Sequence, residues 1–233
     1  MAPRKFSPVG RLLRALLAPR GATIVHLLEP RARQDLEIVR DTRARTDLLV
    51  EDAAAFEILA YVRGARRAGG AMAELGVFAG GTARLICEAK GDATLHLFDV
   101  FDTLQGTAAP APNDELAAEV RGRFGTWHTP RATVERLLAD YPAVAFHPGV
   151  FPASARGLEQ EQFCFVHLDA DLESSTREAL RFFHPRLRPG GIIVGDDYGL
   201  PGVRRAFADY YASQPDALVA LPWGQVVAVK VSG

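Results

Sequence analysis

The stretch FCFVHLDAD (163–171) decides the fold of this chain. Its first seven residues are rich in aromatic and β-branched side chains, which is typical of a buried strand, and the strand ends at carboxylates. Further strands are predicted at 71–77, 93–98, 143–147, 192–196 and 225–231. Helices are predicted at 51–67, 82–90, 133–139, 173–188 and 201–213. Strands that alternate with helices predict one α/β domain built on a doubly wound, mostly parallel sheet.

The composition is that of a globular chain of 233 residues, with 48% hydrophobic and 24% charged residues. Its formal net charge of −1 gives no electrostatic reason to expect a nucleic-acid partner. Cys87 and Cys164 each lie in an apolar run, which excludes a disulfide framework and indicates a reducing compartment. No apolar stretch reaches the roughly 18 residues of a transmembrane segment. We therefore expect a soluble, cytoplasmic domain.

Basic residues are concentrated near the N-terminus. Residues 1–45 carry ten basic and four acidic residues, whereas residues 46–233 carry 17 and 24. We therefore divide the chain into a basic N-terminal extension (1–45) and a main domain (46–233). The extension is interpreted as a lid or an oligomerisation arm that packs on the body or on a partner subunit, and the second arrangement implies a homodimer. A mobile tail and a membrane-surface contact are the alternatives.

The segment 103–130 is irregular, with three prolines and many polar residues. A segment this irregular inside a compact domain is more often functional than idle. Trp127 and His128 are therefore candidate contacts with a substrate, and the alternative for Trp127 is an anchor of the loop. His96 and His167 lie within predicted strands, so we interpret them as packed or supporting residues.

Ligands of open α/β sheets bind beyond the carboxyl ends of the strands, so the residues that follow each strand are informative. The stretch ELGVFAGGT (74–82) has this position, and its glycines allow a ligand to approach the backbone. It matches neither the G-x-G-x-x-G dinucleotide motif nor the G-K-[ST] of a phosphate-binding loop. Asp99 ends the next strand, where a carboxylate accepts hydrogen bonds from the hydroxyls of a ribose. The alternatives are a purely structural turn and a solvated or helix-capping acid.

Four acids follow two of the predicted strands, Asp169 and Asp171 after one, Asp196 and Asp197 after the other. Carboxylates gathered closely repel one another unless a cation or protons neutralise them. Oxygen ligands in this number suit Mg²⁺, Ca²⁺ or Mn²⁺, and no cysteine or histidine spacing suits zinc. The alternative is a set of surface acids paired with arginines such as Arg177. A D-x-D element also occurs in sugar-nucleotide transferases.

Six motifs follow one another along the chain: ELGVFAGGTARLI, LFDVFDTLQG, HPGVFPASA, FVHLDADLESSTREAL, FFHPRLRPGGIIVGDDYG and GVRRAFADYY. Through them, roughly residues 46–231 resemble the macrocin O-methyltransferase (TylF-like) family of class I S-adenosylmethionine-dependent methyltransferases. The resemblance implies a Rossmann-like seven-stranded sheet, S-adenosylmethionine as methyl donor and often a Mg²⁺ ion that binds the acceptor. Typical acceptors of the family are hydroxyls of sugars in natural products and polysaccharides, or phenols.

The resemblance also implies roles for individual residues. The cofactor-binding positions, with Asp99 at the ribose, are Glu74, Gly76, Val77, Gly80, Thr82, Asp99 and Asp169. The metal ligands are Asp169, Asp196 and Asp197. Asp171 is the general base, and Asp169 could exchange this role with Asp171. The predicted substrate contacts are Trp127, His128 and Tyr198.

Two positions depart from the pattern of the family. Many relatives have a tyrosine where this chain has Glu173, and some have a histidine at the position of Asp196. The second difference implies that the metal requirement varies within the family. The basic segment 1–45 matches none of the motifs.

These features lead to one hypothesis, an O-methyltransferase that uses S-adenosylmethionine and Mg²⁺. Its partner is a small-molecule acceptor, a hydroxyl of a sugar or of a glycosylated natural product. A sugar hydroxyl is a weak nucleophile near neutral pH, so a cation that stabilises the alkoxide and a carboxylate that removes the proton both serve the reaction. Three alternatives remain: a metal-independent methyltransferase of a phenol or another small nucleophile, a sugar-nucleotide glycosyltransferase, and a non-catalytic scaffold.

Overall fold

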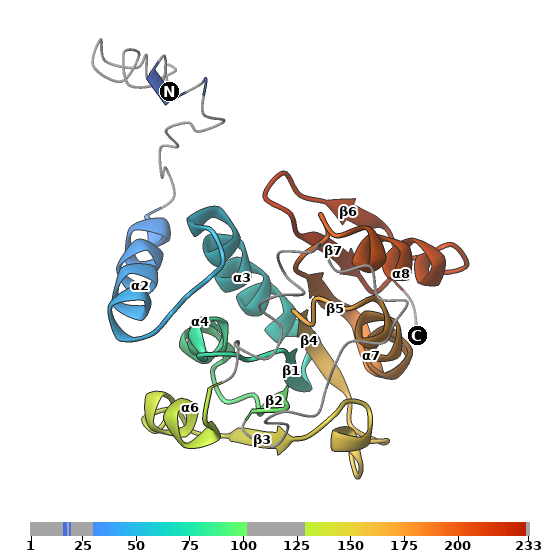
Figure 1. The fold of residues 1–233 in the computed structure, drawn as a ribbon, viewed down its shortest axis with the longest axis horizontal. Helices are drawn as coiled ribbons and strands as arrows, with labels where there is room; N and C mark the ends of the chain where they lie inside the picture. The colour runs from blue at the N-terminus through green and yellow to red at the C-terminus, as the bar shows by residue number, and fades with distance from the viewer. Residues whose placement is uncertain (1–15, 18, 20–29, 102–128, 232–233) are drawn as a thin grey trace. The chain divides into compact units, whose positions relative to one another are not determined.

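A mostly parallel sheet organises the part of the chain that the computed structural model describes, residues 16–17, 19, 30–101 and 129–231. The strands of this part follow the order β3-β2-β1-β4-β5-β7-β6 (Figure 1). They are β1 (Ala71–Leu75), β2 (Leu95–Asp99), β3 (Val144–Pro148), β4 (Phe163–Leu168), β5 (Leu187–Gly195), β6 (Leu218–Ala220) and β7 (Val226–Val229). The first five pair in parallel, and β7 runs antiparallel to β5 and β6. The predicted α/β doubly wound sheet is confirmed.

Helices cover both faces of this sheet (Figure 1). The described helices are α2 (Arg31–Arg45), α3 (Asp52–Ala65), α4 (Gly81–Lys90), α6 (Arg131–Leu137), α7 (Glu173–Phe183) and α8 (Pro201–Tyr211). Alternation along each strand divides the core into two layers. In β5, Ile192 and Val194 belong to the layer that contains Ile58 of α3, whereas Ile193 belongs to the layer that contains Phe207 of α8. The sheet is therefore the middle of three layers.

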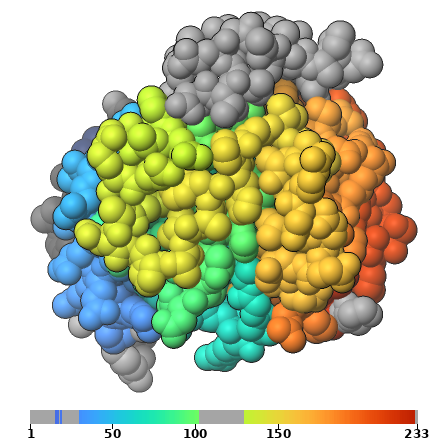
Figure 2. Space-filling view, turned by 90° about the horizontal axis from the view of Figure 1, so that it is seen from below, coloured from blue at the N-terminus to red at the C-terminus, as the bar shows by residue number. Residues whose placement is uncertain are grey.

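The strand β3 lies at one edge of the sheet. Figure 2 shows this side of the molecule, where α6 and β3 in yellow-green and yellow form the middle of the surface and α7 in orange lies beside them. Most residues of β3 are only half-buried, whereas every residue of β1 and β4 is buried. The burial of β1 and β4 places their carboxyl ends near the centre of the domain.

One predicted helix is wrong at its end. The helix predicted over 173–188 stops at Phe183, and residues 184–186 form a 3-10 turn. Pro185 has no backbone N–H to donate, so the helix cannot continue through it. The chain then enters β5 at Leu187, five residues before the predicted start of that strand.

Gly190 and Gly191, which stand between the predicted helix and the predicted strand, lie inside β5. Gly190 donates its N–H to the Lys230 carbonyl oxygen at 2.8 Å, and Lys230 donates to the Gly191 carbonyl oxygen at 2.9 Å. These bonds extend the pairing of β5 with the chain that follows β7. β6 was not predicted, because a strand of three residues is too short to show alternation.

Several predictions lie outside the described residues, among them Trp127, His128, nearly all of 103–130 and most of the N-terminal extension. The structure separates residues 1–36 from residues 37–233, so the second half of α2 belongs to the larger unit. The predicted boundary after residue 45 and the predicted role of the extension stay predictions. Within the described ranges, no helix is long and apolar enough to cross a bilayer.

Aromatic side chains fill the core near β2 and β3. The ring of Phe98 stacks on His147 with centroids 4.6 Å apart and meets Phe183 edge-on at 5.8 Å. His96 Nδ1 and His147 Nε2 are 2.9 Å apart, so a single hydrogen lies between the two rings. Burial lowers the pKa of both imidazoles, and the neighbouring His147 lowers the pKa of His96 further.

The histidine pair predicts a loss of stability in mild acid. The unfolded chain binds more protons than the folded one below the ordinary imidazole pKa of 6.5, so the free energy of unfolding falls as the pH falls through this range. His147→Gln keeps a hydrogen-bonding partner for His96 but does not titrate. We expect its Tm to fall less than that of the unmodified protein between about pH 7.5 and about pH 5.5. An equal fall in both proteins would contradict the assignment.

Candidate active site

The candidate site lies at the carboxyl ends of β2, β1, β4 and β5, which are neighbours in the sheet. The first residues beyond three of these strands continue the ladder, because the N–H groups of Gly76, Asp169 and Asp196 each donate to the adjacent strand at 2.8–2.9 Å. The three residues therefore lie side by side. The structure thus brings the turn after β1 next to the acids that follow β4 and β5.

Two glycines shape the turn after β1. Gly76 has a φ of +86°, and a Cβ at this position would overlap the carbonyl oxygen of Asp169. Gly80 has a φ of +81° at the N-cap of α4, and a Cβ there would lie 2.9 Å from a methyl group of Val134 in α6. Both glycines are thus required by the packing of the protein on itself. The turn can close only because neither residue has a side chain.

Asp99, at the end of β2, binds the same turn. Its Oδ2 accepts hydrogen bonds from the N–H groups of Val77 at 2.6 Å and Phe78 at 3.0 Å, and its Oδ1 accepts one from Phe101 at 2.9 Å. Sequence reasoning did not predict this role. A carboxylate has about four acceptor positions, so Oδ1 has room for one more donor. The contact between Asp99 and a ribose stays a prediction.

Glu74 and Thr82 flank the turn, and both are buried. Glu74 Oε1 lies 3.2 Å from His167 Nδ1, whereas Glu74 Oε2 has no hydrogen-bond partner among the described residues. Burial raises the pKa of Glu74, and the hydrogen bond with His167 acts against this shift.

Three of the four predicted acids form a cluster. Ligand oxygens of Asp169, Asp171 and Asp197 all lie within 4.8 Å of one another. Asp171 and Asp197 have left-handed backbones, with φ of +57° and +54°, a strained conformation for residues other than glycine that is common at functional sites. Asp196 lies beside the cluster, because its Oδ1 accepts the Asp197 N–H at 3.0 Å and its Oδ2 lies 3.4 Å from Gln225 Nε2.

Burial and repulsion between carboxylates raise the pKa of three of these acids, Asp169, Asp171 and Asp196. Burial raises the pKa of Asp169 well above its usual value, and the charges of Asp196 and Asp197 raise it further. Burial and the hydrogen bond with Asp197 raise the pKa of Asp171 to about 8. Burial also raises the pKa of Asp196, while His167 acts in the opposite direction. A divalent cation bound here would displace protons from these acids, since carboxylates bind metals in their ionised form.

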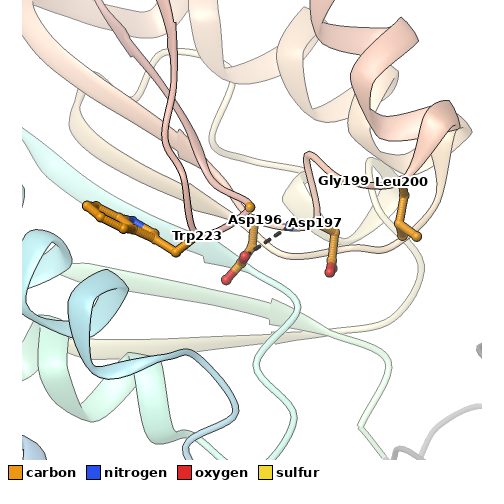
Figure 3. Close-up of a pocket in the computed structure, with 6 residues that line it drawn as sticks. Asp196, Asp197, Gly199, Leu200 and Trp223 are labelled. Atoms are coloured by element: carbon orange, nitrogen blue, oxygen red, sulfur yellow. Dashed lines mark hydrogen bonds between the residues drawn. The ribbon is translucent and has the colours of Figure 1, made fainter. Parts of the chain in front are cut away.

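A cavity of about 190 Å³ opens beside the cluster (Figure 3). It is lined by Asp196, Asp197, Gly199, Leu200, Trp223 and Gly224. In Figure 3, the indole of Trp223 extends from the turn that joins β6 to β7, and the side chain of Asp196 lies between Trp223 and Asp197. The cavity therefore has an acidic wall and an aromatic wall.

Tyr198, a predicted substrate contact, is not among the residues that line this cavity. Its ring meets Phe207 of α8 edge-on at 6.1 Å and lies 5.3 Å from the Arg204 guanidinium. Its role stays a prediction. The other two predicted contacts, Trp127 and His128, lie outside the described residues.

Trp223 and Gln225 received no role from sequence reasoning, and His167 was interpreted only as a packed or supporting residue. The available signal for His167 was a polar side chain in the middle of a buried strand. For Trp223 and Gln225, the signal was the stretch LPWGQ (221–225) before the last predicted strand. Neither signal shows which strands are neighbours in the sheet, and the order of the strands is what brings these residues to the site.

The fold is that of the Rossmann-like class I O-methyltransferases. The O-methyltransferase NovP superposes with a TM-score of 0.70 at 20% identity, over 85% of this chain and 97% of that protein. The calicheamicin methyltransferase CalS11 superposes with a TM-score of 0.63 at 15% identity, over 88% and 94%. The model of the macrocin-O-methyltransferase (TylF) family matches residues 58–219, and the chain belongs to this family.

Two relatives show which acceptors occur among similar proteins. The chain is 32% identical over 152 residues to the 8-demethyl-8-(2,3-dimethoxy-alpha-L-rhamnosyl)-tetracenomycin-C 4'-O-methyltransferase of Streptomyces olivaceus, covering 60% of the chain and 58% of that protein. It is 34% identical over 86 residues to the mycinamicin III 3''-O-methyltransferase of Micromonospora griseorubida, covering 35% of the chain and 34% of that protein. The first match thus spans 58% of the length of its relative, and the second spans 34%.

The turn after β1 makes a prediction about stability. Gly76→Ala adds a Cβ that overlaps the Asp169 carbonyl oxygen and forces a left-handed alanine, so we expect a loss of about 2–5 kcal/mol in the free energy of unfolding. Gly64→Ala in α3 is the matched control, because its Cβ meets nothing within 4 Å. It should stabilise the protein by up to about 1 kcal/mol. Urea denaturation measures both. Equal effects would show that the turn does not need this close approach.

Proposed function

We propose that the chain is an S-adenosylmethionine-dependent O-methyltransferase that acts on a sugar hydroxyl of a glycosylated natural product. Family membership supports the reaction, and the two relatives, named for methyl transfer to the sugars of natural products, support the acceptor class. The observation that carries the proposal is the contact of Gly76 with Asp169. This contact places a turn that suits a cofactor next to a cluster of acids that suits an acceptor.

The residues around the turn fit the donor. S-adenosylmethionine supplies an electrophilic methyl group together with a cationic amino-acid end and a ribose. We assign its binding to Glu74, Gly76, Val77, Gly80, Thr82, Asp99 and Asp169. The fit is supported by Glu74 Oε2, which is buried without a hydrogen-bond partner among the described residues, and by the free acceptor position on Asp99 Oδ1. The O-methyltransferase of Bacillus cereus, solved in complex with S-adenosylhomocysteine, shares this fold with a TM-score of 0.53.

The acids fit a divalent cation. Ligand oxygens of Asp169, Asp171 and Asp197 lie within 4.8 Å of one another, and the raised pKa values of Asp169 and Asp171 mark repulsion that a cation would relieve. We assign Asp169 and Asp197 of this cluster, together with the adjoining Asp196, to the cation, which when bound would stabilise negative charge on the acceptor oxygen.

Asp171 is assigned to the proton. Burial and the hydrogen bond with Asp197 raise its pKa to about 8 without a cation, and beside a bound cation Asp171 would release this proton, which leaves a carboxylate that can accept the proton of the acceptor hydroxyl. It lies within the same cluster, so a hydroxyl that enters beside Asp197 would be near its carboxylate. The adjoining cavity, with its aromatic wall of Trp223, is assigned to the ring of the acceptor.

Calorimetric titration of S-adenosylhomocysteine tests the donor site, first with Mg²⁺ and then with EDTA. We expect micromolar binding in both conditions, because the cation belongs to the acceptor side. Asp99→Ala should weaken this binding by about 1–3 kcal/mol, with folding checked by urea denaturation since Asp99 also holds the turn. No binding in either condition would overturn the proposed function. Methyl transfer that persists in EDTA would instead favour the metal-independent alternative.

A pair of variants tests the division of work among the acids. Asp196→Asn should lower Mg²⁺ affinity by about 10–100-fold, whereas Asp171→Asn should leave it within about threefold and abolish methyl transfer. Mg²⁺ titration in the presence of S-adenosylhomocysteine gives the affinities, and labelled S-adenosylmethionine with a panel of glycosides gives the transfer. The reverse order of the two affinities would make Asp171 a ligand, as the spacing of the cluster allows.

A further inference from the structure

Four polar side chains, three of them buried and that of Asp196 17% exposed, form a row across the sheet, one at each of four neighbouring strands. They are Glu74 in β1, His167 in β4, Asp196 directly after β5 and Gln225 directly before β7. Glu74 is the register partner of His167. Each member lies two residues from an apolar residue of the α3-side core, namely Met72, Phe165, Val194 and Val227. By strand alternation, the whole row therefore lies on that face of the sheet.

His167 occupies the middle of the row and reaches both sides. Its Nδ1 lies 3.2 Å from Glu74 Oε1, and its Nε2 lies 3.9 Å from Asp196 Oδ2. Gln225 Nε2 approaches the same Asp196 oxygen at 3.4 Å. The side chains of His167 and Glu74 are 0% and 1% exposed, so water does not separate them.

The row lowers the stability of the fold. A buried polar group without a hydrogen bond lowers stability by about 1–3 kcal/mol, and apolar residues are usual in the middle of such strands. Glu74 Oε2, His167 Nε2 and Gln225 Oε1 are all buried with no hydrogen-bond partner among the described residues. Stability alone does not account for these residues, which suggests a role at the site.

We propose that His167 is a positioning residue that couples the two halves of the site, holding Glu74 at the cofactor turn and Asp196 at the acceptor side. The inference rests on the proposed function, because it assigns Glu74 to the donor and Asp196 to the cation. Glu74 and Asp196 do not touch each other directly in the row. The imidazole lies between them, with Nδ1 3.2 Å from Glu74 Oε1 and Nε2 3.9 Å from Asp196 Oδ2, so that each nitrogen faces a different half of the site.

Two isosteric substitutions separate the nitrogens. The side-chain amide nitrogen of His167→Asn stands near the place of Nδ1, and that of His167→Gln near the place of Nε2. We expect His167→Asn to keep the affinity for S-adenosylhomocysteine within about threefold and to lower Mg²⁺ affinity by about 10–100-fold. His167→Gln should show the opposite pattern, with S-adenosylhomocysteine binding weakened by about tenfold. Calorimetry measures both affinities, so no acceptor is needed.

Controls distinguish positioning from a purely structural role. His96→Asn and His96→Gln change another buried strand histidine, one that pairs with His147 away from the row, and should leave both affinities unchanged. His167→Leu removes both nitrogens and should weaken both ligands; it should also lower the free energy of unfolding, because the buried Glu74 carboxyl loses its hydrogen-bond partner. Gln225→Leu should lower only the Mg²⁺ affinity.

Three results would overturn the inference. One is an unmodified protein that binds S-adenosylhomocysteine but not Mg²⁺, because Asp196 would then have no cation to hold. Another is His167→Asn and His167→Gln variants that change both affinities equally or not at all. The third is a loss of stability in all His167 variants that accounts for their weaker binding. An unmodified protein that binds no S-adenosylhomocysteine contradicts the proposed function itself, so the two failures are distinguishable.

Discussion

The Gly76 backbone lies so near the Asp169 carbonyl oxygen that a Cβ would overlap it, and the other features of the site depend on this close approach. Because no Cβ separates them, the turn after β1 lies directly against the first residue after β4. The N–H of Asp169 meanwhile continues the ladder between the same two strands at 2.8 Å. The turn that is proposed to bind the cofactor and the acid cluster thus share one piece of rigid backbone. Relative motion of the two halves is restricted at this point.

The carboxyl groups of the cluster, unlike the backbone that holds them, have to be able to change their charge. Asp169, Asp171 and Asp197 are close enough that protons or a cation must occupy the space between them. All three raised pKa values near this cluster have burial as their main cause, and repulsion from neighbouring carboxylates adds to each of them. The fold therefore holds the carboxyl groups together at an energetic cost, which is typical of a site selected for chemistry rather than for stability.

The fold was largely predictable from the sequence, whereas the contacts within the site were only partly so. Buried strands such as 163–168 have a clear pattern, and acids at strand ends follow from the general position of ligands in such sheets. The role of His167 depends on β4 lying between β1 and β5, and a periodicity does not specify strand order. Pro185 was visible in the sequence, but the strong helical pattern before it concealed the early end of α7.

The hydrogen bonds of Asp99 have a consequence for engineering the donor. The carboxylate that is assigned to the ribose also holds the Val77 and Phe78 amides in place. A replacement chosen to admit an analogue with a different sugar would release two backbone donors at the same time. Changes in donor preference are therefore more accessible elsewhere in the pocket than at Asp99, where recognition and loop architecture are combined in one side chain.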